Sequence, residues 1–184
     1  MIPLALAGVG KIARDQHLPA IAGDGGFDLI ATVTLGEPLA GIPNFASITD
    51  LKADFPDVAA VAICTPPIGR SRLVAEAAAA GLAIMIEKPP AATLGEAHAI
   101  ARIAADGGVP LFTAWHSREA AAVAVARDWL ADRAIRTIAV RWHEHIREWH
   151  PGQEWIWQPG IGVFDPAINA FSILSSLVPA PLIV

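Results

Sequence analysis

The fold is decided by the first stretch of the chain, Ile2-Pro3-Leu4-Ala5-Leu6-Ala7-Gly8-Val9-Gly10-Lys11-Ile12-Ala13. A six-residue apolar run ends at two closely spaced glycines, and a helical pattern follows over residues 11–22. The spacing Gly-x-Gly-x-x-Ala at a strand-to-helix junction is typical of a turn whose backbone amides hold the pyrophosphate of a dinucleotide. Because no basic residue precedes the apolar run, we interpret it as a strand and not as a signal peptide.

Apolar runs of strand length continue to alternate with alanine-rich helical stretches along the chain. Strands without polar alternation are buried on both faces, and the intervening helices provide the cover. The sequence therefore predicts an α/β fold with a doubly wound parallel sheet. The predicted strands are 2–7, 29–34, 58–65, 83–87 and 109–114, and the predicted helices are 11–22, 69–80 and 93–105.

The pattern changes after Trp115. We predict a helix over 118–132, an alternating strand over 135–146, a loop over 150–162 and a short helix over 166–177. One strand and two helices cannot bury a second core, so we expect a first domain over 1–117 and a partial second domain over 118–184. The chain stops at Pro181-Leu182-Ile183-Val184, at the start of a further apolar run, so we expect it to be the N-terminal portion of a longer protein.

The composition limits the partners that the chain can bind. Thirteen lysines and arginines against eighteen acidic residues leave a net charge of −5, which provides no cationic field for nucleic acid or an anionic membrane. Apolar residues make up 54% of the chain, yet no uninterrupted stretch reaches the roughly 18 residues of a membrane span. A single cysteine, Cys64, excludes an internal disulfide and is typical of a reducing compartment, so we expect a cytoplasmic protein.

The end of the second predicted strand bears on which dinucleotide the turn would hold. An acid about 20 residues after the glycine turn usually bonds the ribose of NAD, whereas a nearby arginine accommodates the 2′-phosphate of NADP. This strand ends at Thr34, with Asp28 at its opposite end, Glu37 beyond the turn and no arginine beside it. NAD and NADP therefore both stay open, and Thr34 favours NADP slightly because its hydroxyl can donate to a phosphate oxygen.

Glu87-Lys88-Pro89 follows a later strand. Taken alone, Lys88 fits a surface lysine ahead of a rigid proline turn. Strand carboxyl ends in such a sheet also border the ligand crevice, where a lysine beside a nicotinamide can bond a sugar hydroxyl and help to remove its proton.

Asp165 and Asn169 form a third candidate site. Asp before Pro166 is a strong helix N-cap signal, with the proline at the first helical position, so capping alone can explain Asp165. Asn169 lies four residues further on and shares a helical face with Asp165. That face would offer a carboxylate and an amide to one ligand.

A histidine-rich stretch provides a metal site as an alternative. On a strand, His143 and His145 share one face, and together with His150 they could ligate zinc, although an exposed histidine pair is commoner. The same region carries four tryptophans, Trp142, Trp149, Trp155 and Trp157. Tryptophans are mostly core or lid residues, and they also stack on sugar rings.

Three of these motifs resemble, in order and spacing, those of the glucose-fructose oxidoreductase/inositol dehydrogenase (Gfo/Idh/MocA) family. They are Gly8-Val9-Gly10-Lys11-Ile12-Ala13, Glu87-Lys88-Pro89 and Asp165-x-x-x-Asn169. Three longer stretches are similar to the family's sugar 1-dehydrogenases: Ile12-Ala13-Arg14-Asp15-Gln16-His17-Leu18-Pro19-Ala20-Ile21, Thr113-Ala114-Trp115-His116-Ser117-Arg118 and Trp149-His150-Pro151-Gly152-Gln153. The resemblance spans the whole chain.

The resemblance implies a Rossmann domain followed by an α/β domain on an open sheet. It further implies oxidation of an aldose of the L-arabinose or D-galactose type at C1 to the lactone, with hydride passed to NAD or NADP. Leu35 stands where these relatives tend to carry an arginine for the 2′-phosphate. The implied cofactor contacts are Gly8, Gly10, Lys11, Ile12, Ala13, Thr34, Thr65, Pro66, Glu87 and Lys88.

For the sugar, the resemblance implies an acid/base pair and a set of hydroxyl-binding side chains. Lys88 and Asp165 would form the acid/base pair, with Asn169 where many relatives have histidine. The implied sugar contacts are His116, Glu144, Trp149, His150, Asp165 and Asn169. The alternatives are a non-catalytic dinucleotide-binding protein and a zinc enzyme. We expect a small-molecule sugar as the partner, neither nucleic acid nor membrane, and a homo-oligomer formed through the second-domain sheet.

Overall fold

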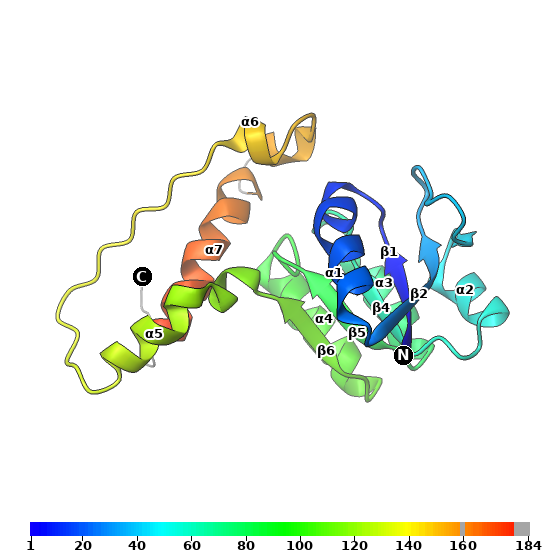
Figure 1. The fold of residues 1–184 in the computed structure, drawn as a ribbon, viewed down its shortest axis with the longest axis horizontal. Helices are drawn as coiled ribbons and strands as arrows, with labels where there is room; N and C mark the ends of the chain where they lie inside the picture. Colours follow the sequence, from blue (N-terminus) through cyan, green and yellow to red (C-terminus); the bar gives the residue numbers. More distant parts are fainter. Residues whose placement is uncertain (159–160, 179–184) are drawn as a thin grey trace. The chain divides into compact units, whose positions relative to one another are not determined.

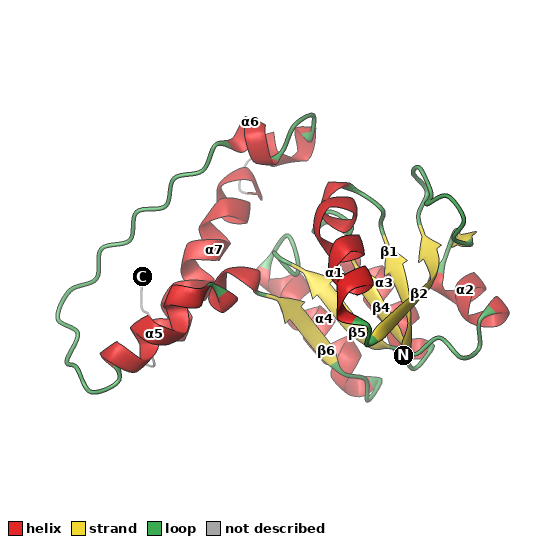
Figure 2. Ribbon diagram, viewed as in Figure 1, coloured by secondary structure: helices red, strands yellow, loops and turns green. Residues whose placement is uncertain are grey.

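The computed structural model describes residues 1–158 and 161–178, and the chain divides into two compact units. Unit 1 comprises Met1–Ala114 and unit 2 comprises Trp115–Val184. Figure 1 follows the chain through both units, and Figure 2 separates strands from helices. The division falls between residues 114 and 115, three residues before the end of the domain predicted from the sequence.

Unit 1 is built on a six-stranded sheet in the order β3-β2-β1-β4-β5-β6, in which every neighbouring pair is parallel. The strands are β1 (Ile2–Ala7), β2 (Phe27–Val33), β3 (Asn44–Phe45), β4 (Ala60–Ile63), β5 (Ala83–Glu87) and β6 (Leu111–Ala114). This order is that of dinucleotide-binding doubly wound sheets, in which ligands bind at the carboxyl ends of the strands. The predicted parallel sheet is therefore confirmed.

Helices cover both faces of this sheet. They are the π-helical turn η1 (Ala13–His17), α1 (Leu18–Asp24), α2 (Ile48–Asp54), α3 (Arg70–Ala79) and α4 (Leu94–Asp106). Successive residues of β1 point to opposite faces. Ala5 and Ala7 join the core under α2, α3 and α4, whereas Leu4 and Leu6 pack with residues of η1 and α1.

Two elements of unit 1 were not predicted. β3 has only two residues, which is too short to produce a periodic pattern, and α2 presents only Ile48 and Leu51 to the core. The expected single helix over 11–22 instead contains the π-helical turn η1 before α1. The helix expected from residue 93 begins with Thr93 as its N-cap, whose side chain accepts the N–H of Glu96.

Unit 2 is mainly helical. Its elements are η2 (His116–Glu119), α5 (Ala121–Leu130), α6 (Ile146–Trp149), η3 (Glu154–Trp157) and α7 (Ile161–Leu177). Helix α7 packs against α5, η2 and η3, and Figure 1 shows α5 and α7 side by side. No helix within residues 1–158 and 161–178 is long and apolar enough to cross a membrane.

The strand predicted over 135–146 is wrong, because residues 134–145 form no regular structure. The alternating apolar side chains are present, and Ile138, Val140 and Trp142 are 43%, 51% and 41% exposed. A strand needs a neighbouring strand to take its backbone N–H and C=O groups. Within the described part of unit 2 there is no strand to serve as that neighbour.

The helix predicted over 166–177 begins five residues earlier, at Ile161. Asp165 is therefore inside the helix and is not its N-cap, and Pro166 lies in the second turn. Proline has no N–H, so it cannot bond the carbonyl of Gly162. The loss is confined to one bond near the start of the helix, and the Asp165 side chain is engaged by His150 instead.

Candidate functional site

The glycine turn after β1 is tightly packed at one glycine and open at the other. Gly8 has φ +88°, and a Cβ added there would lie 2.9 Å from the backbone nitrogen of Thr65. A Cβ added at Gly10 would meet no atom within 4 Å. Gly8 thus lets the turn pass against the end of β4, whereas the space over Gly10 fits a ligand that approaches the backbone.

Thr65 gives a second sign of a ligand site at this turn. Its hydroxyl oxygen is buried, and among the described residues it is the one buried side-chain nitrogen or oxygen without a hydrogen-bond partner. An unsatisfied buried hydroxyl is unusual in a folded protein and is often completed by a bound group or water. The open space over Gly10 and this hydroxyl both fit the dinucleotide that the motif predicts.

The loop after β2 is held by Asn44 and by Thr34 itself. The Asn44 carboxamide accepts the N–H of Thr34 and donates to the Thr34 carbonyl, both at 3.1 Å. The Thr34 hydroxyl accepts the N–H of Gly36 at 3.1 Å, so its own proton is available for donation to a phosphate oxygen. Leu35 is 88% exposed and brings no charge to this loop.

At the carboxyl end of β5, Glu87 is buried and fully engaged. One carboxylate oxygen lies 2.7 Å from Nε2 of His17, and the other accepts the N–H of Lys88 at 3.0 Å. Lys88 is half-buried at the same strand end and precedes Pro89 through a cis peptide bond. His17 thereby links the helix after the glycine turn to the strand end that carries Lys88.

Arg70, the first residue of α3, holds the carboxyl ends of β4 and β5 in place. Its buried guanidinium donates to the backbone carbonyls of Thr65, Glu87 and Pro89, which ties the ends of β4 and β5 together. Burial raises the pKa of the neighbouring Cys64 thiol to about 12; the Glu87 carboxylate adds to this shift, and Arg70 opposes it. The role of His17 was not predicted from the sequence. Arg70 was not identified at all, because nothing in the local pattern marks an arginine as buried.

Unit 2 gathers a second set of predicted residues around α7. Asp165 and Asn169 lie one helical turn apart and are 3% and 6% exposed. Asn169 donates to Glu144 at 3.2 Å and accepts from the hydroxyl of Ser117 at 3.1 Å. His116 contacts the same hydroxyl through Nδ1 at 3.4 Å.

The remaining predicted residues of unit 2 are His150 and Trp149. His150 Nε2 lies 3.2 Å from Oδ2 of Asp165, and the two side chains are 14% and 4% exposed. Trp149 lies on α6 beside His150 in the sequence, with 59% of its surface exposed. The structure thus brings five of the six expected sugar contacts into one polar cluster, and the ring of Trp149 stays at the surface.

The position of one proton in this cluster follows from its geometry. An indole N–H only donates, so the Gln153 atom that lies 3.0 Å from Nε1 of Trp155 is its oxygen. That oxygen also lies 3.2 Å from Nδ1 of His150 and accepts its proton. His150 therefore joins Gln153 on its Nδ1 side to Asp165 on its Nε2 side, at 3.2 Å each. Ser117 and Gln153 carried no recognisable signal of their own in the sequence.

The zinc alternative is not supported by the arrangement of the histidines. His143 and His145 lie in the irregular segment 134–145, so the strand that would have aligned them is missing. Within residues 1–158 and 161–178, no three His, Cys, Asp or Glu side chains are grouped in a way that could hold a metal.

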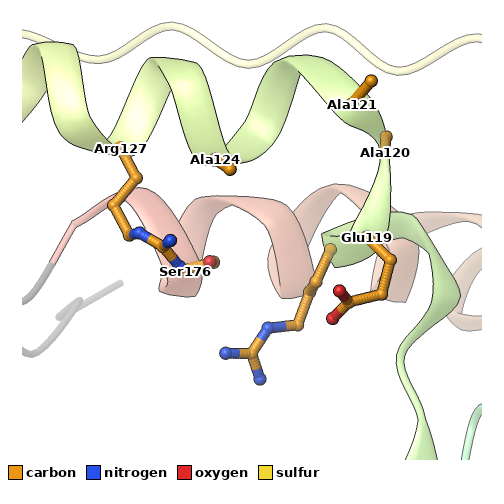
Figure 3. A pocket seen from close by; sticks show the side chains of 7 residues that line it. Glu119, Ala120, Ala121, Ala124, Arg127 and Ser176 are labelled. Carbon is orange, nitrogen blue, oxygen red and sulfur yellow. The ribbon is translucent and has the colours of Figure 1, made fainter.

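A shallow surface hollow lies between α5 and α7 (Figure 3). None of the residues predicted for the cofactor or the sugar lines it. Its lining residues are Arg118, Glu119, Ala120, Ala121, Ala124, Arg127 and Ser176. We therefore do not count this hollow as part of the candidate site.

Residues 2–115 match the family model GFO_IDH_MocA, described as an oxidoreductase family with an NAD-binding Rossmann fold. The chain therefore belongs to this oxidoreductase family. It is 50% identical over all of its 184 residues to a galactose 1-dehydrogenase of Pseudomonas fluorescens, of which it covers 59%. A 1,5-anhydro-D-fructose reductase of Ensifer adhaerens is 34% identical over 144 residues, which are 74% of this chain and 43% of that protein.

A solved structure shows the same similarity to galactose dehydrogenases. The crystal structure of D-galactose-1-dehydrogenase from Rhizobium etli matches 98% of this chain and 59% of its own, with a TM-score of 0.90 and 44% identity. The chain thus spans about three fifths of the length of the galactose dehydrogenases that it matches. The resemblance to the Gfo/Idh/MocA family, deduced from the three motifs, is confirmed.

Proposed function

We propose that this chain forms the cofactor domain and part of the sugar site of an NAD(P)-dependent sugar 1-dehydrogenase. Its substrate would be an aldose of the D-galactose or L-arabinose type, oxidised at C1 to the lactone. One observation carries the proposal: Asp165 and Asn169 lie one turn apart on α7, both buried, each joined to a further polar side chain. The names of the two similar galactose dehydrogenases support galactose in particular.

The glycine turn would hold the dinucleotide. Backbone amides from Gly8 to Ala13 would bind the pyrophosphate, and the open space at Gly10 leaves room for it. Lys11, Ile12, Thr34, Thr65, Pro66 and Glu87 complete the set of expected contacts. When bound, the oxidised nicotinamide supplies the hydride acceptor.

In the sugar site, Asp165 would act as the base. His150 Nε2 lies 3.2 Å from one carboxylate oxygen of Asp165 and would hold the carboxylate in place while it takes the proton of the C1 hydroxyl. Lys88, which unit 1 holds at the end of β5, would bond the same hydroxyl and assist its deprotonation. The C1 hydroxyl thus loses a proton to Asp165 as the C1 hydride leaves, so the sugar gives up two electrons.

The other polar side chains would orient the sugar. Glu144 can accept from sugar hydroxyls, and Asn169 holds its carboxylate in place at 3.2 Å. His116 and His150 would border the sugar as part of the same cluster, and the exposed Trp149 offers an apolar face for the sugar ring. We place this chemistry in the cytoplasm, with assembly of copies through the second-domain region as a further part of the proposal.

The test measures NAD(P)H formation by absorbance with galactose or arabinose, on this chain and on a full-length version. We expect sugar-dependent reduction of the cofactor, and Asp165→Asn should lower turnover roughly 10²-fold or more. Asp128→Asn removes an exposed carboxylate of α5 and serves as the matched control. Cofactor binding without turnover in both versions would instead indicate a dinucleotide-binding protein, and zinc in the purified protein would revive the metal alternative.

A further inference from the structure

Arg14 lies on η1, and its guanidinium joins two loops of unit 1. Its Nε–H donates to the carbonyl of Val9 in the glycine turn at 3.2 Å. An N–H of Nη2 donates to the carbonyl of Glu37, 23 residues away in the loop after β2, at 3.0 Å. In a doubly wound sheet, the adenosine ribose of a dinucleotide lies between these two loops.

The anchoring leaves most of the guanidinium available. Arginine carries five N–H groups, and the two carbonyls take one each from Nε and Nη2. The remaining three belong to Nη1 and Nη2, which form the fork that binds phosphate oxygens in pairs. Because Arg14 is exposed and its plane is already fixed, little side-chain entropy is lost when an anion binds.

The charges around Arg14 are compatible with an anion. The nearest cation in the sequence, Lys11, is ion-paired with Asp15 on the same helical stretch. Glu37 contributes its backbone carbonyl to Arg14, and its side chain is the one acidic group of the loop after β2. Thr34, at the start of that loop, keeps its hydroxyl proton for donation because its oxygen already accepts from Gly36.

We propose that Arg14, together with the Thr34 hydroxyl, binds the 2′-phosphate of NADP and makes the chain prefer NADP to NAD. The inference rests on the proposed function only in requiring that the glycine turn holds a dinucleotide. The sequence showed no arginine next to Thr34, because Arg14 reaches this loop from η1, on the other side of the glycine turn. Leu35, next to Thr34, is exposed and brings no charge of its own.

The test measures binding and does not depend on turnover. Dissociation constants for NADPH and NADH are measured by nicotinamide fluorescence, and those for adenosine 2′,5′-bisphosphate and AMP by calorimetry, at one fixed salt concentration. We expect Arg14→Gln to weaken NADPH and the bisphosphate about 10- to 100-fold, which is the usual loss for charge-assisted hydrogen bonds. NADH and AMP should change less than about twofold.

Two further variants separate recognition from structure. Arg14→Lys keeps the charge without the fork and should fall between the other two proteins. Arg72→Gln removes an exposed arginine of α3, which pairs with Glu76, and should change none of the four constants. Thermal unfolding of each variant checks that unit 1 is intact.

Each other outcome overturns the inference in a recognisable way. Equal weakening of NADPH and NADH by Arg14→Gln would show that Arg14 only supports the loops. A wild-type protein that binds NADH as well as NADPH would refute the preference and leave the proposed function standing. A wild-type protein that binds neither nucleotide would refute the proposed function as well.

Discussion

The two units treat their apolar strands differently. In unit 1, β1, β4 and β5 are central strands with neighbours on both sides, and residues such as Ala5 and Val61 are completely buried. In unit 2, segment 134–145 has the alternating pattern of a strand but no regular structure, and its apolar side chains are exposed. A strand pattern in the sequence therefore marks apolar side chains that need to be buried. The strand itself forms only where neighbouring elements are present to pair with it and bury them.

The largest expected effect tests this comparison directly by hydrogen exchange. Amides of β1 and β4 are bonded within a covered sheet and should exchange only through global unfolding, with protection on the order of 10⁴-fold or more. Amides of 134–145 should exchange nearly as fast as in an unfolded peptide. Mass spectrometry of peptides from both regions provides the measurement, with α5 as a helical reference inside unit 2.

Protection of 134–145 comparable to that of β1 would contradict the comparison. Repeating the measurement at lower protein concentration then identifies the cause. Protection that is lost on dilution would show that the segment pairs with a second copy. Protection that is independent of concentration would show a strand formed within one chain.

The same contrast explains which features were predictable. The glycine turn and the strand at Ile2–Ala7 were predicted correctly because each is encoded by adjacent residues. The N-cap role of Asp165 was wrong because the helix begins at Ile161, and the contact of Asp165 with His150 is not revealed by any local pattern. Arg70 was missed because it bonds carbonyls 17 and 19 residues away, and Gln153 was quoted as part of a similar stretch but given no role.

Substitution of Lys88 tests whether the end of β5 has a catalytic role or only a structural one. If Lys88 helps to deprotonate the C1 hydroxyl, Lys88→Met should lower kcat roughly 10² to 10⁴-fold, or about 3 to 5 kcal/mol of barrier. If it is only a charge beside a turn, stability should shift by no more than about 0.5 kcal/mol and turnover should stay normal. The measurement uses the shortest form of the protein that shows sugar-dependent NAD(P)H formation.

Two further variants serve as controls for Lys88→Met. Lys52→Met removes a lysine of α2 that bonds the carbonyls of Pro56 and Val58, and it should leave kcat unchanged. The double variant with Asp165→Asn should be little worse than the poorer single variant, because groups that act on the same proton are not additive. Additive losses would show that the two side chains serve different steps.

The two glycines of the turn after β1 should respond differently to substitution. Gly10→Val meets no atom within 4 Å at its Cβ, so the fold should be retained while the side chain fills the space for the pyrophosphate. We expect a loss of dinucleotide affinity of roughly 100-fold, or about 2.7 kcal/mol, measured by nicotinamide fluorescence. Unchanged affinity would refute the assignment of the cofactor to this turn.

Gly8→Ala provides the contrasting variant. The positive φ and the approach to Thr65 should lower the free energy of unfolding by at least about 1 to 3 kcal/mol. Chemical denaturation of both variants checks the difference. A Gly8→Ala protein as stable as the wild type would show that the turn can relax, and Gly10 would then no longer be distinguished from Gly8 by packing.

The smallest expected effect concerns the buried thiol of unit 1, which has no counterpart in unit 2. Burial raises the pKa of Cys64 to about 12 from an ordinary value of 9.0. Below pH 9 the thiol is protonated in both the folded and the unfolded chain, so it places no alkaline penalty on folding there. Between about pH 9 and 12 only the unfolded chain loses the proton, so the free energy of unfolding should fall by roughly 1.4 kcal/mol per pH unit. The chain has no tyrosine, which leaves few other groups that ionise in this range.

Denaturant unfolding at pH 8 and pH 10 should therefore show the wild type losing about 1.4 kcal/mol more than Cys64→Ala, whose small cavity lowers stability equally at both pH values. Parallel losses in the two proteins would show that water or a local opening reaches Cys64, and that the core of unit 1 is less tightly closed at the end of β4 than its burial indicates.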